Sequence, residues 1–298
     1  RTGGVTMANT GTVWDMIATI TLLDLIAYEF LKRKLGQCHG DVFVIHEYLG
    51  RLDAAIAVAS YRKSVSGYAE PDIRFGEKSR ISLRVEGMIH PLLEDPVPND
   101  WITERSMLIT GSNASGKSTY LKTAALTALL AQSICTAPAR RYEAGAFRIY
   151  SSMALSDDLL AGESYYIVET RSLKRIVDST GDGPVLCVID EVLRGTNTVE
   201  RIAASCEVLR ALAADGALCL AATHDIELCG LLEPAYALYH FEERIEGREM
   251  VFDYRLRAGK ATSRNAIDLL RLIGFDEAIV DRAHARANAY METGAWRA

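Results

Sequence analysis

The stretch GSNASGKST, residues 111–119, constrains the fold of this chain more than any other feature. It matches the pattern G-x-x-x-x-G-K-[ST] through Gly111, Gly116, Lys117 and Ser118. Glycines let the backbone curl so that its N–H groups point inward, and the start of a following helix adds its positive dipole end; both favour bound phosphate. A Gly/Ser-rich surface turn is the alternative, but the stretch has an apolar strand pattern before it and an apolar helical pattern after it. The sequence therefore predicts a phosphate-binding loop between a buried strand and a helix.

Other apolar runs predict the rest of the fold. Segments 106–110, 185–190 and 217–223 are short and continuously apolar, which is typical of strands covered by helices on both faces. The remaining expected elements are helices at 118–134 and 202–213, two strands around a Glu-Gly turn within 235–256, and an amphipathic helix at 276–292. We therefore expect an α/β fold with a mixed, mostly parallel sheet flanked by helices.

The N-terminal part of the chain predicts a helical arm. Helical patterns at 13–35 and 43–65 indicate an antiparallel hairpin across the turn GQCHGD. Asp15, Asp24 and Glu29 interrupt the first pattern, so it lacks the ~18 uncharged apolar residues that a membrane span needs.

These patterns divide the chain into two parts. Pro71 closes the arm, so we expect a helical hairpin at 1–70 and a nucleotide-binding domain at 71–298. The chain begins RTGGVTM, without an initiator Met or a signal-peptide pattern, and we expect it to be a piece of a longer protein.

Composition excludes several classes of function. The chain has 298 residues, 49% hydrophobic and 24% charged, which is enough to bury a sizeable core. Its formal net charge of −6 argues against a broad nucleic-acid-binding surface, although it leaves room for a local basic groove. Its six cysteines form no CxxC pair and mostly lie in apolar runs. They predict buried thiols of a reducing compartment rather than a disulfide framework or a zinc site.

An acidic pair ends the apolar run VLCVID. Asp190 is the last residue of this predicted strand, where a carboxylate beside a phosphate loop can hold Mg²⁺ together with the Ser118 hydroxyl. Glu191 follows and is suited to orient or deprotonate an attacking water, as a general base does. An acidic strand end that caps a helix is the alternative, and the phosphate loop in the same sheet pattern argues against it.

Two further segments carry candidate site residues. His224 follows the run ALCLAAT and is expected at the same edge of the sheet, where it can sense a γ-phosphate or position water; a structural histidine is the alternative. Ser164 lies in DDLLAGESYYIVE, where a Gly-x-Ser before a helix offers an anion-binding N-terminus; a simple helix start is the alternative.

The order of these motifs resembles a known family. From residue 81 to 283 the chain carries, in sequence, IHPLL, VPND, TGSNASGKST, DDLLAGESYYIVE, VIDEVLRGTNT, ATHDIEL and AGKATSRNAIDLLRLIGFDEAIVDRA. Together they look like the ATPase domain of the MutS family of DNA mismatch-repair proteins, relatives of ABC-type ATPases. The resemblance implies a P-loop NTPase of the ABC-ATPase type. The N-terminal hairpin is similar to the end of the family's helical lever arm, and the C-terminal helices to its dimerisation segment.

The resemblance also implies roles for particular residues. Two such domains would pair as a homodimer and sandwich ATP, with Mg²⁺ held by Ser118 and Asp190 and hydrolysis served by Glu191 and His224. Ser164 would reach the γ-phosphate of the partner's nucleotide. The loop residues implied in ATP binding are Gly111, Ser112, Asn113, Ala114, Ser115, Gly116, Lys117, Ser118 and Thr119, and those implied near the adenine are His90 and Asn99. The resemblance further implies DNA binding through regions outside this chain, mismatch-repair partner proteins and a cytoplasmic location.

The chain departs from the family pattern at several positions. Tyr165 and Tyr166 stand where the family has Thr-Phe, NTVER follows Gly195-Thr196 where the family prefers Ser-Thr-x-Asp-Gly, and Pro96 replaces an aromatic that stacks on adenine. GTNTVER, THDIEL and FDYRL are similar to a divergent MutS-related branch with N-terminal membrane-spanning helices. A nucleotide-gated scaffold or membrane-tethered protein without mismatch recognition is therefore the alternative function. An ABC transporter subunit fits poorly, since no LSGGQ-like signature is present.

Overall fold

The computed structural model describes residues 20–75, 82–112, 115–153, 165–246, 249–261 and 266–294. The chain separates into two compact units, Arg1–Ser64 and Val65–Ala298, which are described in turn.

A six-stranded sheet forms the centre of the second unit, in the order β12-β9-β4-β8-β7-β6. Its strands are β4 (Ser106–Thr110), β6 (Arg148–Ser152), β7 (Val185–Asp190), β8 (Leu218–Ala222), β9 (Tyr236–His240) and β12 (Arg257–Ala258). Every pairing in it is parallel except that of β12 with β9. The predicted α/β fold with a mixed, mostly parallel sheet flanked by helices is thus confirmed.

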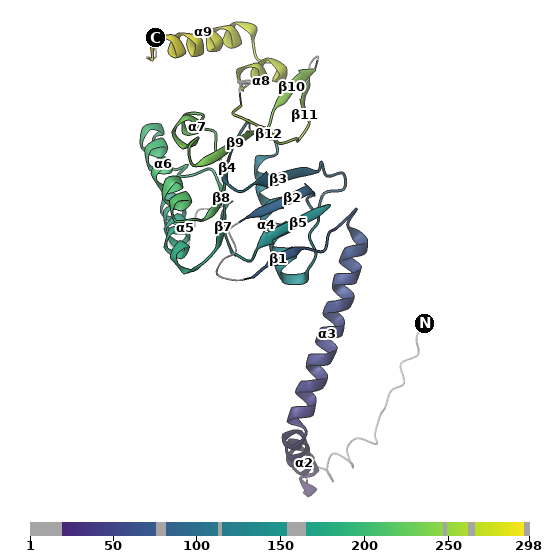
Figure 1. Cartoon of the computed structure of the whole chain (residues 1–298). Coiled ribbons are helices and arrows are strands. Elements are labelled where there is room, and N and C mark those ends of the chain that lie inside the picture. The colour runs from purple at the N-terminus through teal and green to yellow at the C-terminus, as the bar shows by residue number, and fades with distance from the viewer. Residues whose placement is uncertain are drawn as a thin grey trace, which may run out of the picture. The chain divides into compact units, whose positions relative to one another are not determined.

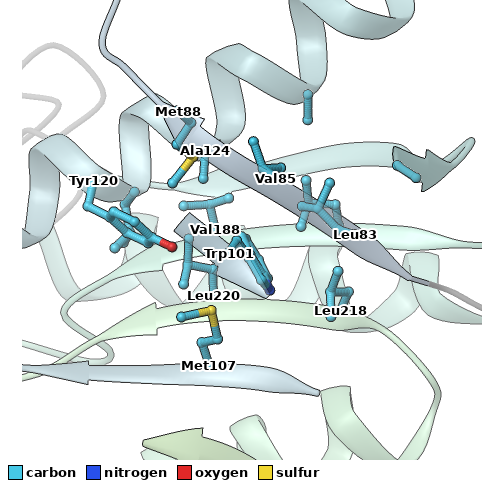
Figure 2. Close-up of a cluster of buried hydrophobic side chains, with 14 of the residues drawn as sticks. Leu83, Val85, Met88, Trp101, Met107, Tyr120, Ala124, Val188, Leu218 and Leu220 are labelled. Carbon is cyan, nitrogen blue, oxygen red and sulfur yellow. The ribbon is translucent and has the colours of Figure 1, made fainter. Parts of the chain in front are cut away.

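A smaller sheet packs against helix α4 (Lys117–Ile134) and the main sheet. Its order is β1-β5-β2-β3, with β1 (Asp72–Arg74), β2 (Leu83–Met88), β3 (Asn99–Thr103) and β5 (Arg141–Gly145). α4 contacts β2 on one side and β6, β7 and β8 on the other. Figure 2 shows the core between them, formed by Leu83, Val85, Met88, Trp101, Met107, Tyr120, Ala124, Val188, Leu218 and Leu220. The packing fixes α4, and therefore the loop at its start, against the end of β4.

Three helices cover the opposite face of the main sheet (Figure 1). They are α5 (Tyr165–Ser179), α6 (Thr198–Ala214) and α7 (Glu227–Leu232), and the short 3₁₀ helix Thr180–Asp182 follows α5. Leu173 and Ile176 of α5 are buried against Leu209 and Leu212 of α6 and the apolar strand residues of this face. Both faces of β4, β7 and β8 are therefore covered, which is why these strands read as continuous apolar runs.

The C-terminal part differs in detail from the sequence prediction. Segment 235–256 holds three strands rather than two: β9, then β10 (Glu243–Glu246) paired with β11 (Glu249–Phe252) in a separate hairpin. The chain leaves the main sheet at Phe241, whose N–H donates to Thr110 O at 3.1 Å. The described chain continues with α8 (Ala266–Ile273) and ends in α9 (Glu277–Thr293).

The first unit is helical. It consists of α2 (Leu23–Gln37) and α3 (His39–Ser64), separated by Cys38 alone where the sequence predicted a longer turn. Cys38 N–H donates to Lys34 O at 3.0 Å and Cys38 O accepts from Val42 N–H at 3.0 Å, so α2 ends and α3 begins at this one residue. No described helix is long and apolar enough to cross a membrane. The division at 70/71 and the lever-arm assignment stay predictions.

Candidate functional site

The loop after β4 has the backbone that its glycines predict. Gly111 has φ +142° and Gly116, the N-cap of α4, has φ +106°, conformations that other residues rarely adopt. A Cβ on Gly111 would lie 2.8 Å from Phe241 O, so only glycine lets the loop pass this close to the chain after β9. Asn113 and Ala114 lie outside the described residues.

Lys117 is folded back onto this loop. Its Nζ donates to the carbonyl oxygens of Gly111 at 2.7 Å and Ser112 at 2.6 Å, and its side chain is buried. Burial lowers the pKa of Lys117 to about 8, against the opposing effects of Asp190, Glu191 and Glu243. The ammonium group is thus held inside the loop by weak neutral acceptors, with three carboxylates near it.

Two serines of the loop differ in their contacts. Ser112 Oγ donates to Glu243 Oε2 at 2.8 Å. Ser115 Oγ is buried and has no hydrogen-bond partner among the described residues. An unpaired buried hydroxyl is costly, and a phosphate oxygen beside it would remove that cost. The unpaired hydroxyl, the lysine and the glycine backbone together fit a bound nucleotide phosphate.

The loop opens into a cavity of about 520 Å³, within the usual range for a small-molecule site. The predicted residues that line it are His90, Asn99, Ser112, Ser115, Gly116, Lys117, Ser118, Thr119, Glu191 and His224. Pro96 also lines it. The phosphate-loop residues and the candidate hydrolytic residues therefore share one cavity, as parallel strands whose carboxyl ends meet at one edge predict.

Aromatic side chains border this cavity at positions that the sequence reasoning did not assign. Tyr254 lines it, is 45% exposed and has φ +53°. Its segment is held by Asn99, whose Nδ2 donates to Tyr254 O at 2.8 Å and whose Oδ1 accepts from Leu256 N–H at 2.7 Å. Phe241 lines the cavity as well. Asn99 thus holds the backbone of the segment that places Tyr254 at the cavity. This segment is the sequence motif FDYRL.

Glu191 occupies a strained position directly after β7. Its φ is +58°, and its N–H donates to Ala222 O at 3.0 Å, extending the pairing with β8. Its Oε1 lies 3.0 Å from His224 Nε2, and its Oε2 lies 2.7 Å from Arg194 Nε. Arg194, which the sequence reasoning left without a role, therefore holds the second oxygen of this carboxylate.

His224 is the other half of this contact. Burial and the positive charge of Lys117 lower the pKa of His224, while the contact with Glu191 raises it; the net direction is downward. At neutral pH the imidazole is therefore mainly uncharged, and it fixes the Glu191 carboxylate as a neutral hydrogen-bonding partner.

Asp190 and Ser118 provide the hard oxygen donors expected for magnesium. Asp190 is the last residue of β7, and its negative charge is close enough to raise the pKa of Lys117. Ser118 follows Lys117 and lines the cavity. The described residues contain no group of three or more His, Cys, Asp or Glu side chains suited to a metal. Magnesium at nucleotide sites uses one or two protein oxygens together with phosphates and water, and the hydroxyl and carboxylate fit that requirement.

Ser164 lies outside the described residues, directly before the start of α5 at Tyr165. Its predicted reach to a partner's nucleotide stays a prediction.

Comparisons with known proteins show the family to which this chain is similar. Residues 107–291 match the family model described as MutS domain V. Over 212 residues the chain is 38% identical to the DNA mismatch repair protein MutS of Natronomonas pharaonis, covering 67% of this chain and 24% of that protein. It is 34% identical over 248 residues to that of Thermus thermophilus (81% and 29%) and 33% identical over 283 residues to that of Sorangium cellulosum (90% and 30%). The chain thus spans 24% to 30% of the length of these relatives.

Proposed function

Because this chain belongs to the MutS family, matching its domain V over residues 107–291, we propose that it is the Mg²⁺-dependent ATP-binding and ATP-hydrolysing module of a mismatch-repair protein. One observation carries the proposal: the loop with Lys117 and the Glu191–His224 pair line the same cavity. The fold proposed is a P-loop NTPase of the ABC-ATPase type.

Phosphate binding is assigned to the loop and Lys117. The ammonium group exchanges its two loop carbonyls for phosphate oxygens, which are stronger acceptors because they are charged. Ser115 donates its free hydroxyl to the phosphates, and the N-terminus of α4 adds its dipole. Ser118 and Asp190 would hold Mg²⁺, which when bound neutralises phosphate charge.

Hydrolysis is assigned to Glu191. Its carboxylate orients a water molecule and accepts a proton from it as the water oxygen attacks the γ-phosphorus. The bond between the γ-phosphorus and the β–γ bridging oxygen breaks, and ADP leaves with that oxygen. His224 and Arg194 hold its two oxygens, so the carboxylate is presented in one orientation. Preorganisation of this kind contributes to catalysis because the group need not be reoriented during the reaction.

We also propose that two copies pair around ATP, with Ser164 completing the partner's site and the C-terminal helices contributing to the homodimer. ATP binding would close the dimer and hydrolysis would release it. This cycle would control a DNA clamp formed by regions outside this chain. We place the protein in the cytoplasm, where it would act with mismatch-repair partner proteins. The similarity to DNA mismatch repair proteins supports a repair role over a membrane-tethered scaffold. The six cysteines are free thiols, as is usual in a reducing compartment.

A single substitution tests the hydrolytic assignment. Glu191→Gln keeps the size of the side chain but cannot accept the proton, so turnover should fall on the order of 10²-fold or more while ATP still binds. ATP binding and phosphate release are measured side by side, with Lys117→Ala as the variant expected to lose binding. The exposed Glu207→Gln is the control and should turn over normally. Normal turnover by Glu191→Gln would refute the proposal.

A further inference from the structure

Helix α5 buries a carboxylate on its apolar face. Glu169, Leu173 and Ile176 are spaced so that they share one side of the helix, and all three are buried, with Glu169 only 1% exposed. Leucine and isoleucine pack against the main sheet, but a buried glutamate needs polar partners to offset its desolvation. Burial raises the pKa of Glu169, and two backbone hydrogen bonds oppose the rise.

Those bonds come from the loop that carries Glu191. Leu193 N–H donates to Glu169 Oε1 at 2.6 Å, and Arg194 N–H donates to Oε2 at 3.0 Å. Each oxygen of the carboxylate is therefore occupied by one backbone amide. Both amides belong to the short segment between β7 and α6, so one side chain of α5 fixes two consecutive peptide groups of this segment.

The backbone of this segment is strained at two residues. Glu191 has φ +58° and Leu193 has φ +56°, and neither is glycine. A residue with a side chain is strained in this conformation, which persists only where the surroundings determine it. Glu191 is anchored by its N–H bond to Ala222 O, and Ser205 Oγ donates to Val192 O, between the two strained residues, at 3.2 Å. The two bonds to Glu169 hold the backbone at Leu193 and directly after it.

The start of α5 also lies against this segment. A Cβ on Gly195 would come within 2.9 Å of Tyr166 Cβ, so the helix and the loop approach as closely as glycine permits. Arg194, whose amide Glu169 accepts, holds Glu191 Oε2 through its Nε at 2.7 Å. The chain of contacts thus runs from α5 through Glu169 and Arg194 to the carboxylate assigned to hydrolysis.

We propose that Glu169 is a positioning residue for ATP hydrolysis: it holds the segment 191–195 in the strained conformation that presents Glu191 to His224 and the nucleotide cavity. This inference rests on the proposed function. Glu169 does not line the cavity, so its effect is on the chemical step rather than on nucleotide binding. Any displacement of α5 relative to the main sheet is passed to Glu191 through the same two amides.

The test compares Glu169→Gln with the wild type. Glutamine has the same size but only one oxygen, and its NH₂ group faces an amide N–H, so one bond is lost and one contact becomes repulsive. We expect kcat to fall on the order of 10–100-fold, as small misplacements of catalytic groups do, with KM and the Kd for ATP changed less than about twofold. Hydrogen–deuterium exchange should rise at the amides of Leu193 and Arg194.

The control is Asp178→Asn, which removes the same charge from an exposed side chain of α5 and should leave every measurement unchanged. Wild-type kcat or unchanged amide exchange in Glu169→Gln would overturn the positioning role. A parallel loss of kcat, ATP affinity and melting temperature would also overturn it, because that pattern indicates a merely structural residue. Normal turnover by Glu191→Gln, in contrast, would refute the proposed function itself.

Discussion

At the scale of single residues, the site is organised by carboxylates and the groups that hold them. Glu191 is fixed at both oxygens, Lys117 is surrounded by three acidic side chains, and Glu169 binds two backbone amides. The lysine is the exception, because its own contacts are neutral carbonyl oxygens and its burial favours the uncharged amine. Its charge is therefore sensitive to pH in the alkaline range.

Nucleotide affinity should consequently depend on the protonation of Lys117. The pKa of about 8 lies below the ordinary 10.5, so the amine loses its charge as pH rises through 8 in the free protein. Since only the ammonium form attracts the phosphates, the affinity for ATP should fall towards tenfold per pH unit above that point. Binding of a fluorescent, non-hydrolysable ATP analogue to the unsubstituted protein between pH 7 and 9.5 measures this.

Lys117→Arg is the matched variant, because a guanidinium stays charged throughout that range. Its affinity should be flat with pH, whatever its absolute value. A flat profile in the protein that retains Lys117 would show that the lysine is not the titrating partner of the phosphates.

Residues in continuous motifs could be placed from sequence, although their roles stay predictions. The structure brings Ser112, residues 115–119, Glu191 and His224 to one cavity, as their positions after neighbouring strands of the sheet predict. Glu169 and Tyr254 could not be assigned from sequence because their contacts are distant along the chain. Glu169 accepts from amides 24 and 25 residues away, and the Tyr254 segment is held by Asn99. The glutamate left one signal, a charged residue on the apolar stripe of a predicted helix.

At the scale of elements, the same contrast holds. β4, β7 and β8 were predictable to within a residue because burial on both faces leaves an uninterrupted apolar run. β1 and β5 were not, because they are short, carry charged residues and pair with each other across a long stretch of chain, as Asp72 opposite Glu143 shows. Such strands exist through their tertiary partners rather than through local pattern.

One ion pair between elements should contribute measurably to the free energy of unfolding. Arg201, near the start of α6, binds Asp225 through Nε at 2.8 Å and a terminal nitrogen at 2.6 Å, and Asp225 directly follows His224. Both side chains are largely buried. Asp225→Asn should lower the free energy of unfolding by about 1.5–3 kcal/mol, as loss of hydrogen bonds to charged groups does. Urea unfolding measures the change.

The control for this pair lies on the same helix. Glu207 and Arg210 form an exposed pair, so Glu207→Gln should change the free energy of unfolding by no more than about 0.5 kcal/mol. Equal effects of the two substitutions would mean that the Arg201–Asp225 pair does not hold α6 to the segment that carries His224.

At the scale of the whole molecule, the proposed ATPase site is completed by a second copy of the chain. The cavity of one chain contains the phosphate loop, Glu191 and His224, and the proposal assigns the remaining contact to Ser164 of the partner. Pairing of this kind leaves little trace in a single sequence, because the residues of a composite site need not be close in either chain. The resemblance to the family implies the pairing of two copies, and measurements in solution test it.

The most direct test is ATP turnover by the purified chain as a function of its concentration, with and without Mg²⁺. If two copies complete each site, the turnover per molecule rises with concentration, approaches a plateau when the dimer is saturated, and requires Mg²⁺. The protein concentration is varied from far below to far above micromolar. A turnover per molecule that stays constant over this range would contradict a site completed by dimerisation.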